Sequence, residues 1–344
     1  MTTRHGALLI SIDFELYWGV RDKRSLASYQ ENLAGVWQAI PRTLALFSEM
    51  DIHATWATVG LLFCKDQREA RHYAPGELPA YVTPGLSPYD YLASDEALDP
   101  RYHFCPELID QIAACPNQEI ATHTFSHFYC QEAGQTLDAF AADLDAALAV
   151  ARDRRLRMRS IVFPRNQWNS AYLPALKRRG IQCFRGNEPN WFYRAVESSG
   201  QGLLRRAGRF IDTYANLCGH QTYVPAAQGA DEPYNFPASR FLRPYSKRLA
   251  LLEPLRLRRI RQALRHAAKH GQVFHLWWHP HNFGVDTDRN MIFLQKVLRE
   301  FSELRSRYGM QSLTMAELCE QTEAAYGLAP PVRSRLSKQL EPAS

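Results

Sequence analysis

The sequence predicts an α/β fold, a distorted (β/α)7-type barrel with two long loop insertions. Short apolar runs alternate along the chain with longer segments whose apolar residues recur at helical spacing, and this alternation favours a mostly parallel sheet. The 344 residues hold roughly seven or eight such strand–helix units, a number that suits a barrel. Polar clusters also follow the ends of several apolar runs, where a parallel barrel collects its functional side chains.

The composition excludes several classes of protein. Hydrophobic residues make up 46% and charged residues 22% of the chain, which excludes a wholly disordered or collagen-like protein. No apolar run approaches the roughly 18 residues of a membrane span, and the first residues lack the pattern of a secretion signal. The seven cysteines have no framework spacing and indicate reduced thiols, so we expect a cytoplasmic protein. The net charge of +6 is only a weak indication of an anionic partner.

The first third of the chain supplies two strands, a helix and the first insertion. Ala7–Ile12 is a short buried strand, and His53–Val59 is rich in β-branched residues and predicts the second strand. Between them, Asn32–Met50 has apolar residues at helical spacing, and we expect Pro41 to kink or split this helix. Residues 66–105 are rich in Pro, Gly and Tyr without a clear period, which predicts a long loop insertion.

The middle of the chain alternates regularly between helices and strands. A glycine, Gly180, closes one of the helices in the manner of a helix C-terminus. The predicted helices are Pro106–Cys115, Leu137–Arg155 and Tyr172–Gly180, and the predicted strands are Glu119–Thr122, Ser160–Phe163 and Ile181–Arg185.

The last part of the chain begins with the second insertion, residues 188–247, which is irregular and rich in Gly, Pro and Asn. Regular alternation then resumes. The predicted elements are the helix Pro254–His270, the strand Gln272–Trp278, the helix Asp288–Tyr308, the strand Met310–Leu313 and the helix Met315–Tyr326. We therefore expect one barrel domain over residues 1–329, followed by a flexible tail at 330–344.

Two acids follow the first strand. Asp13 and Glu15, in S-I-D-F-E, are alternate residues. Alternate residues of an extended chain share a face, so both carboxylates can point into one barrel mouth. The alternative is a loop aspartate beside a surface glutamate.

Two histidines, His123 and His127 in H-T-F-S-H, are candidate metal ligands. Histidines at i and i+4 meet on one face of a helical turn and can offer two ring nitrogens to one cation. A strand precedes them, which places His123 at its C-terminal end. A carboxylate as third ligand would complete a catalytic site with a position open for water. The alternative is chance, since the chain contains 12 histidines.

Two more polar clusters end predicted strands. In F-P-R-N-Q-W, Arg165 could orient a carboxylate or contact a sugar oxygen or a phosphate, and Asn166 could bind substrate or cap a turn. In L-W-W-H-P-H, His279 is placed to act as a general acid or base. At least one of the two tryptophans there belongs to the core. We expect Trp278 and His281 to contact the substrate.

Together these motifs resemble those of the polysaccharide deacetylase superfamily (carbohydrate esterase family 4, the NodB-like homology domain). S-I-D-F-E resembles its first motif, and H-T-F-S-H is similar to its second motif, H-[ST]-x-x-H. F-P-R-N stands where the family carries an Arg/Pro motif, although it departs from the common R-x-P form, and L-W-W-H is similar to L-x-x-H. The order and spacing of the motifs agree over residues 7–320.

The resemblance implies a divalent metal, typically zinc, and a role for each matching residue. Because the family usually has adjacent acids, the roles of the two acids here could be exchanged. By position, the resemblance implies His123, His127 and Glu15 as metal ligands, Asp13 as the base, Arg165 as the residue that orients the base, and His279 as the general acid.

The resemblance also implies the reaction, removal of an N-acyl (acetyl or formyl) group from an amino sugar. S-I-D-F-E-L-Y-W-G and F-P-R-N-Q resemble the subgroup associated with bacterial surface-polysaccharide (O-antigen) synthesis. For that subgroup we expect an N-acylated sugar carried on a nucleotide or on a polyprenyl phosphate. Trp191 could stack on the sugar or pack in the core.

The segment 240–270 is strongly basic, with leucines between its arginines and lysines. It reads either as an outer helix with a solvated basic face or as a peripheral contact with the anionic inner face of the membrane. Nucleic acid is not an expected partner, because this segment has few aromatic residues and the chain has no recognised nucleic-acid motif.

Two other functions are compatible with the same motifs. One is hydrolysis of a non-sugar amide on the same barrel, since the motifs do not distinguish acyl groups. The other is a non-catalytic carbohydrate-binding protein that retains the fold. The second alternative predicts the loss of a ligand or of the acid, yet all these residues are present.

Overall fold

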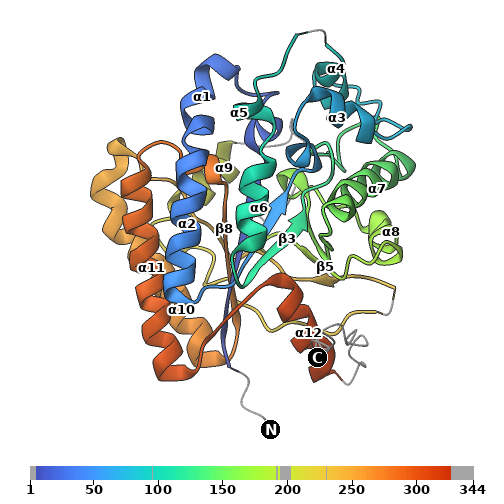
Figure 1. Cartoon of the computed structure of the whole chain (residues 1–344). Coiled ribbons are helices and arrows are strands. Elements are labelled where there is room, and N and C mark those ends of the chain that lie inside the picture. Colours follow the sequence, from blue (N-terminus) through green and yellow to red (C-terminus); the bar gives the residue numbers. More distant parts are fainter. Residues whose placement is uncertain (1–4, 95, 191–192, 194–202, 230, 327–344) are drawn as a thin grey trace, which may run out of the picture.

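A parallel sheet of nine strands curves into a barrel with helices on its outside (Figure 1). The computed structural model describes residues 5–94, 96–190, 193, 203–229 and 231–326. The strands follow the order β6-β5-β4-β3-β2-β1-β8-β7, and β9 (Gln311–Leu313) pairs with the start of β1. The longer strands are β1 (Ala7–Phe14), β2 (Ala54–Thr58), β3 (Gln118–Thr122), β4 (Ser160–Val162), β5 (Cys183–Arg185) and β8 (Val273–Trp278).

One extended segment closes the barrel. Its first part, β6 (Tyr234–Asn235), pairs with β5, and its last part, β7 (Arg240–Phe241), pairs with β8. Between them, the N–H of Phe236 donates to the carbonyl of Phe184 at 2.9 Å, and the N–H of Ser239 donates to the carbonyl of His275 at 2.8 Å. The segment therefore crosses from one edge of the sheet to the other. Strands β1 to β5, this segment and β8 make up the barrel, which confirms the expected (β/α)7-type fold.

Alternate side chains of β1 face the outside and the inside of the barrel wall. All eight residues of β1 are buried. Leu8 and Ile10 belong to the large apolar core under the helices. Ala7 and Leu9 join side chains of β2, β4, β5 and α12 (Met315–Ala325) in a smaller cluster inside the barrel. The same alternation brings Asp13 to the inner side, near the carboxyl end of the strand.

Helices cover the outside of the barrel (Figure 1). The helices that surround it are α2 (Val36–Met50), α6 (Pro106–Ala114), α7 (Leu137–Asp153), α8 (Leu173–Arg178), α10 (Glu253–His270) and α11 (Thr287–Tyr308). These agree closely with the predicted ranges. Within the described part of the chain, no helix has the length and apolar character needed to cross a bilayer.

The helix predicted over residues 32–50 is in fact two helices. α1 (Leu26–Ala34) and α2 are separated at Gly35, and α2 continues through Pro41. A Cβ at Gly35 would lie 2.0 Å from the carbonyl oxygen of Gly284. The chain therefore breaks where the backbone needs a close approach, and the expectation that Pro41 splits the helix is wrong.

Both predicted insertions contain short regular elements. The first holds α3 (Gln67–Tyr73), α4 (Pro88–Ala93) and α5 (Pro100–His103), and the second holds α9 (Leu203–Asp212), β6 and β7. The two-residue strands and the helices of one or two turns were not predicted because they are too short to show a period. Helix α9, with ten residues, was also missed although it is long enough to show one. The predicted tail, 330–344, lies outside the described residues.

Candidate active site

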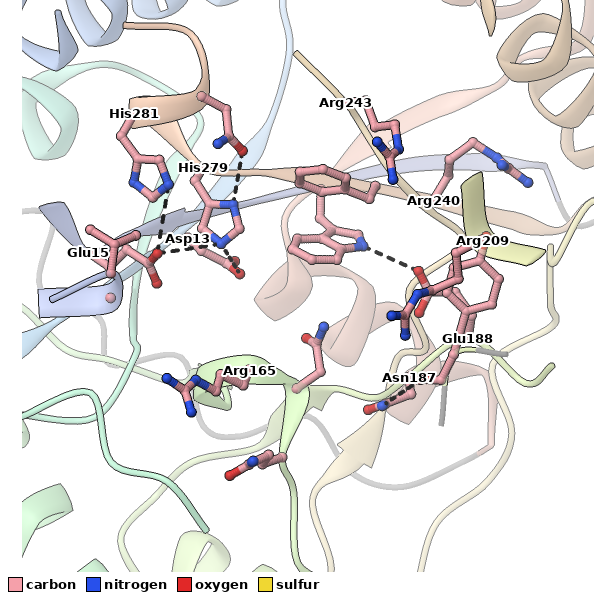
Figure 2. A pocket seen from close by; sticks show the side chains of 18 of the residues that line it. Asp13, Glu15, Arg165, Asn187, Glu188, Arg209, Arg240, Arg243, His279 and His281 are labelled. Atoms are coloured by element: carbon pink, nitrogen blue, oxygen red, sulfur yellow. Dashed lines mark hydrogen bonds and ion pairs between the residues drawn. The ribbon is translucent and has the colours of Figure 1, made fainter. Parts of the chain in front are cut away.

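A cavity of about 500 Å³ opens at the carboxyl ends of the barrel strands (Figure 2). Its lining comes from the ends of β1 and β8, the loops after β3, β4 and β5, helix α9 and the segment around β7. Cavities of this size accommodate a drug-sized ligand, which is more than a single sugar ring. The fold thus places a substrate-sized cavity where parallel barrels carry their chemistry.

Three buried side chains form a candidate metal site at one end of this cavity. The donor atoms of Glu15, His123 and His127 all lie within 4.8 Å of one another, and this is the one such group of His, Cys, Asp or Glu among the described residues. Oε2 of Glu15 is 3.0 Å from Nε2 of His127 and 3.4 Å from Nε2 of His123. The structure therefore groups Glu15, and not Asp13, with the two histidines.

The two histidines converge through a loop, and the helical turn expected from their spacing is wrong. β3 ends just before His123, and φ is positive at Thr124 (64°) and at His127 (63°). These left-handed residues turn the chain so that the two ring centroids lie 5.0 Å apart. The spacing of the two histidines correctly indicated that their rings lie close together, although the chain between them is a loop and not a helical turn.

A buried carboxylate holds this loop in place. Asp143 on α7 accepts hydrogen bonds from the N–H groups of Phe125 and Ser126, at 2.7 and 3.2 Å, and from the hydroxyl of Tyr89 at 2.7 Å. Burial raises the pKa of Asp143, and these hydrogen bonds to its carboxylate oppose the rise. Nothing in its Ala-rich helix distinguishes this acid from a surface residue, so sequence analysis missed it.

The orientation of His123 and the position of Glu15 are both constrained. Nδ1 of His123 lies 2.7 Å from the carbonyl oxygen of Val162. Because a carbonyl only accepts, Nδ1 carries a proton, and Nε2 is the ring nitrogen that faces Glu15. At Glu15, the constraint is Gly19, where a Cβ would lie 2.0 Å from Cδ of the carboxylate. A larger residue at position 19 would displace the glutamate.

The charge states of these groups suit a divalent cation. Burial alone would raise the pKa of Glu15, but His279 and the hydrogen bond from His127 hold it well below its usual range. Burial lowers the pKa of His127 to about 4, although Glu15 opposes this, so the ring is neutral at neutral pH. Nε2 of His123 is buried without a hydrogen-bond partner among the described residues. An ionised carboxylate, a neutral imidazole and an orphaned ring nitrogen fit a metal such as zinc.

Asp13 lies beside this triad and is held by Arg185. The guanidinium of Arg185 binds both carboxylate oxygens of Asp13 at 2.7 Å and also donates to Oγ of Ser11 at 2.9 Å. Burial alone would raise the pKa of Asp13, but the charge of Arg185 and its hydrogen bonds lower it. Asp13 is therefore ionised and fixed in orientation.

The structure places Arg165 and Asn166 in the cavity wall, with partners that differ from the expected ones. Arg165 binds the carboxylate of Asp22 and lies 3.6 Å from Oε1 of Glu132. The contact with Asp13 that was expected of Arg165 is made by Arg185. Asn166 supports that contact, because its Oδ1 accepts a hydrogen bond from Arg185 at 2.8 Å.

His279 and His281 face the acids from the end of β8 (Figure 2). Nε2 of His279 is 3.8 Å from Oδ2 of Asp13 and 3.6 Å from Oε1 of Glu15. His281 stacks on His279 with ring centroids 4.9 Å apart, and its Nε2 is 4.0 Å from Oε1 of Glu15. Burial, together with His279, lowers the pKa of His281 to about 3, so this ring is neutral.

The tryptophan that lines the cavity is Trp277, and the expectation that Trp278 contacts substrate is not met. Trp278 is 1% exposed and stacks on Phe283 in the outer core, with ring centroids 5.7 Å apart. Alternation along β8 puts Trp277 on the opposite, inner face, where it lines the cavity beside Phe241. Trp191 lies outside the described residues.

Arg185 and Trp277 are site residues that sequence analysis did not select. Like the predicted site residues, each stands at or near the carboxyl end of a barrel strand, where parallel barrels gather their functional side chains. Arg185 ends the predicted strand Ile181–Arg185, and that position was the available signal. Trp277 directly precedes the buried Trp278, so the alternation of side chains along the strand places it on the opposite, inner face.

No family model matches the chain, and no curated protein matches it in sequence. Solved structures do share its fold. A protein from Mycobacterium smegmatis assigned to the polysaccharide deacetylases superposes with a TM-score of 0.61 at 14% identity, covering 100% of this chain and 97% of that one. A second, from Pseudomonas aeruginosa PAO1, has a TM-score of 0.54 at 11% identity and covers 92% and 91% of the two chains.

A 4-α-glucanotransferase from Thermococcus litoralis shares the barrel as well. Its TM-score is 0.51 at 13% identity, over 92% of this chain and 40% of that one. The comparisons therefore establish the fold, which is common to proteins assigned to deacetylases and to a glucanotransferase. Because one barrel serves different reactions, the side chains of the site have to carry the functional argument.

Proposed function

We propose that this protein is a metal-dependent hydrolase that removes an N-acyl group, acetyl or formyl, from an amino sugar. The observation that carries the proposal is the buried triad Glu15, His123 and His127. Beside it lie an ionised acid, Asp13, and an imidazole, His279. The shared fold with proteins assigned to the polysaccharide deacetylases and the resemblance of the four motifs support the same reaction.

The triad would hold a divalent cation, for which Zn²⁺ is the best match to two imidazoles and a carboxylate. Three protein ligands leave a position open for water or for the acyl oxygen. When bound, such a cation lowers the pKa of water and polarises a carbonyl group.

Asp13 is the base in this proposal. Its carboxylate accepts the proton that the attacking water loses, and Arg185 keeps that carboxylate ionised and in one orientation. A carboxylate with a lowered pKa is a weak base. Such a weak base would be sufficient for a water molecule whose pKa a bound cation lowers.

His279 is the acid. Its Nδ1 donates to Oδ1 of Asn282 at 3.1 Å, which directs Nε2 towards the two carboxylates. In the protonated ring, Nε2–H delivers a proton to the departing nitrogen, which would otherwise leave as an unstable anion. The products are a free amino sugar and a short carboxylic acid.

The substrate we propose is an N-acylated sugar of bacterial surface-polysaccharide (O-antigen) synthesis, carried on a nucleotide or on a polyprenyl phosphate. The aromatic wall of the cavity supports a sugar ligand. Phe241 and Trp277 lie with ring centroids 4.7 Å apart and line the cavity next to His279. Aromatic faces of this kind stack on the apolar faces of sugar rings.

The same proposal includes a cytoplasmic location with peripheral membrane contact through exposed side chains of the basic segment. In the basic segment 240–270, Arg256 and Arg259 are buried, and Arg265 pairs with Glu300 at 2.6 Å. An exposed patch remains near the start of α10, with Leu251 94% exposed. We call this the α10 patch; it consists of Lys247, Arg248, Leu251, Leu255 and Arg258. Mixed basic and apolar surfaces of this kind suit anionic bilayers.

Metal analysis and amine release test the proposed function. The purified protein should contain about one equivalent of zinc or another divalent metal by mass spectrometry, an expectation that follows from one set of ligands. His123→Ala and Glu15→Ala should lose it, while His53→Ala, which removes a histidine bound to Glu317 far along the chain, should keep it. Release of free amine from N-acetyl and N-formyl amino sugars, free and nucleotide-linked, is then assayed. A full metal content in His123→Ala would contradict the ligand assignment.

A further inference from the structure

The cavity has a second end that is strongly cationic. Figure 2 shows Arg209, Arg240 and Arg243 on the opposite side of the cavity from the acids and histidines of the reaction end. Arg206 also lines the cavity. We call Arg206, Arg209, Arg240 and Arg243 the arginine cluster. Two of its members come from α9 and two from β7 and the residues after it, so segments far apart in the sequence meet here.

Trp277 connects the two ends. Its ring centroid is 5.6 Å from that of His279, and its Nε1 donates to Oε1 of Glu188 at 3.4 Å. Glu188, Arg209 and Arg240 line the same part of the cavity (Figure 2). A single ligand that lies along Trp277 would therefore reach both the reacting groups and the arginines.

Two acids of the described residues lie near the arginine cluster. Asp212 binds Arg240 at 3.1 Å and is also 3.4 Å from Arg259. Among the described lining residues, the acid at this end is Glu188, whose pKa burial raises while Arg185 and Arg240 oppose the rise. Burial lowers the pKa of Arg209, and Glu188 opposes this more strongly than the neighbouring Arg206 adds to it. The cluster therefore brings several guanidinium groups to one part of the cavity.

Given the deacylase function proposed above, we propose that the arginine cluster binds the diphosphate through which the amino sugar is attached to its carrier. Guanidinium groups form paired, charge-assisted hydrogen bonds with phosphate oxygens. Several guanidinium groups around one part of a cavity favour a ligand with more than one negative charge. Nucleoside diphosphate sugars and polyprenyl diphosphate sugars share this chemistry.

Binding of inorganic pyrophosphate, measured by isothermal titration calorimetry, tests the cluster directly. The measurement uses the full chain with His123→Ala, so that pyrophosphate does not bind through a metal ion. Arg206 is exposed, and substitution there leaves the core intact. Arg206→Glu and Arg243→Glu should each weaken binding about tenfold or more, the cost of losing charge-assisted hydrogen bonds. The control Arg258→Glu makes the same charge change on α10 outside the cavity and should leave the affinity within about twofold, as for a screened distant charge.

Absence of saturable pyrophosphate binding, or equal affinity in Arg206→Glu, Arg243→Glu and the control, would overturn the proposal. Displacement of pyrophosphate by UDP and by farnesyl diphosphate distinguishes the carriers, because the tighter competitor identifies a nucleotide or a lipid. Displacement by neither would overturn the carrier assignment.

The amine-release assay separates this proposal from the one on which it rests. Deacylation of an uncharged N-acyl sugar without pyrophosphate binding would remove the role of the arginine cluster and leave the hydrolase. Pyrophosphate binding without deacylation of any N-acylated sugar would overturn the hydrolase, and with it the carrier role of the arginines.

Discussion

Replacing Arg185 by methionine tests how the barrel holds the buried carboxylate of Asp13, the proposed base. Arg185 is 0% exposed and donates hydrogen bonds to Asp13 at 2.7 Å through two nitrogens, with further bonds to Ser11 and Asn166. Methionine has a similar length without the charge, so Asp13 would remain as a buried acid without its partner. Removal of one member of a buried ion pair costs about 3–5 kcal/mol. That is a large share of the roughly 5–15 kcal/mol that stabilises a typical domain.

Urea unfolding measures this loss, and two further variants identify its source. Adding Asp13→Asn to Arg185→Met removes the uncompensated carboxylate and should recover about 2 kcal/mol or more. Arg42→Met breaks an exposed pair with Asp288 and should cost about 1 kcal/mol or less. Amine release should be lost in both Arg185 variants, since Asp13 loses either its orientation or its charge. Arg185→Met with wild-type stability, or no recovery in the double variant, would refute the reasoning.

Three further predictions concern other parts of the molecule. Asp143→Ala removes the acceptor for two N–H groups of the loop that carries His123 and His127. This variant should bind zinc about 10-fold or more weakly in equilibrium dialysis. Asp145→Ala, on the exposed face of the same helix, should not change zinc binding. Burial lowers the pKa of His275 from 6.5 to about 3, so below pH 6.5 the unfolded chain takes up a proton that the folded chain excludes. The free energy of unfolding should therefore fall by about 1.4 kcal/mol per pH unit from this group as the pH drops from 6.5 towards 3, and His275→Gln should remove that part of the slope in urea unfolding. Leu251→Glu should reduce sedimentation of the protein with anionic vesicles at low salt. Ile292→Glu, which changes an exposed apolar residue of α11, should not reduce it. Equal sedimentation of the two variants would exclude the α10 patch as the membrane contact.

The fold could be predicted because its signals are local and repeated. Each long barrel helix shows apolar residues at helical spacing, and each long strand shows a short apolar run, so their order alone indicates a parallel barrel. The closing segment, residues 234–242, could not be predicted in this way. Its backbone pairs with β5 at one end and with β8 at the other, and this pairing depends on edges that the rest of the chain provides.

The candidate site could be predicted in part for the same reason. Asp13, Glu15, His123 and His279 stand at the ends of recognisable strands, and the barrel brings strand ends together. The local sequence does not show which of two arginines contacts Asp13. Arg165 and Arg185 both follow this rule, and only the pairing of β4 with β5 and the positive φ of Arg165 (56°) determine which guanidinium faces Asp13.

The two acids of the first motif obtain different partners because the strand ends between them. Asp13 keeps the inward direction of β1 and meets Arg185. After Phe14 the chain leaves the strand, and Leu16, with φ at 45°, starts the short helix η1 (Leu16–Gly19). This turn brings Gly19 against the carboxylate of Glu15, whose Oε2 then reaches both ring nitrogens of the histidine loop. Along a continuing strand these two alternate residues would point the same way, so the immediate turn after Phe14 is what gives Glu15 partners that differ from those of Asp13.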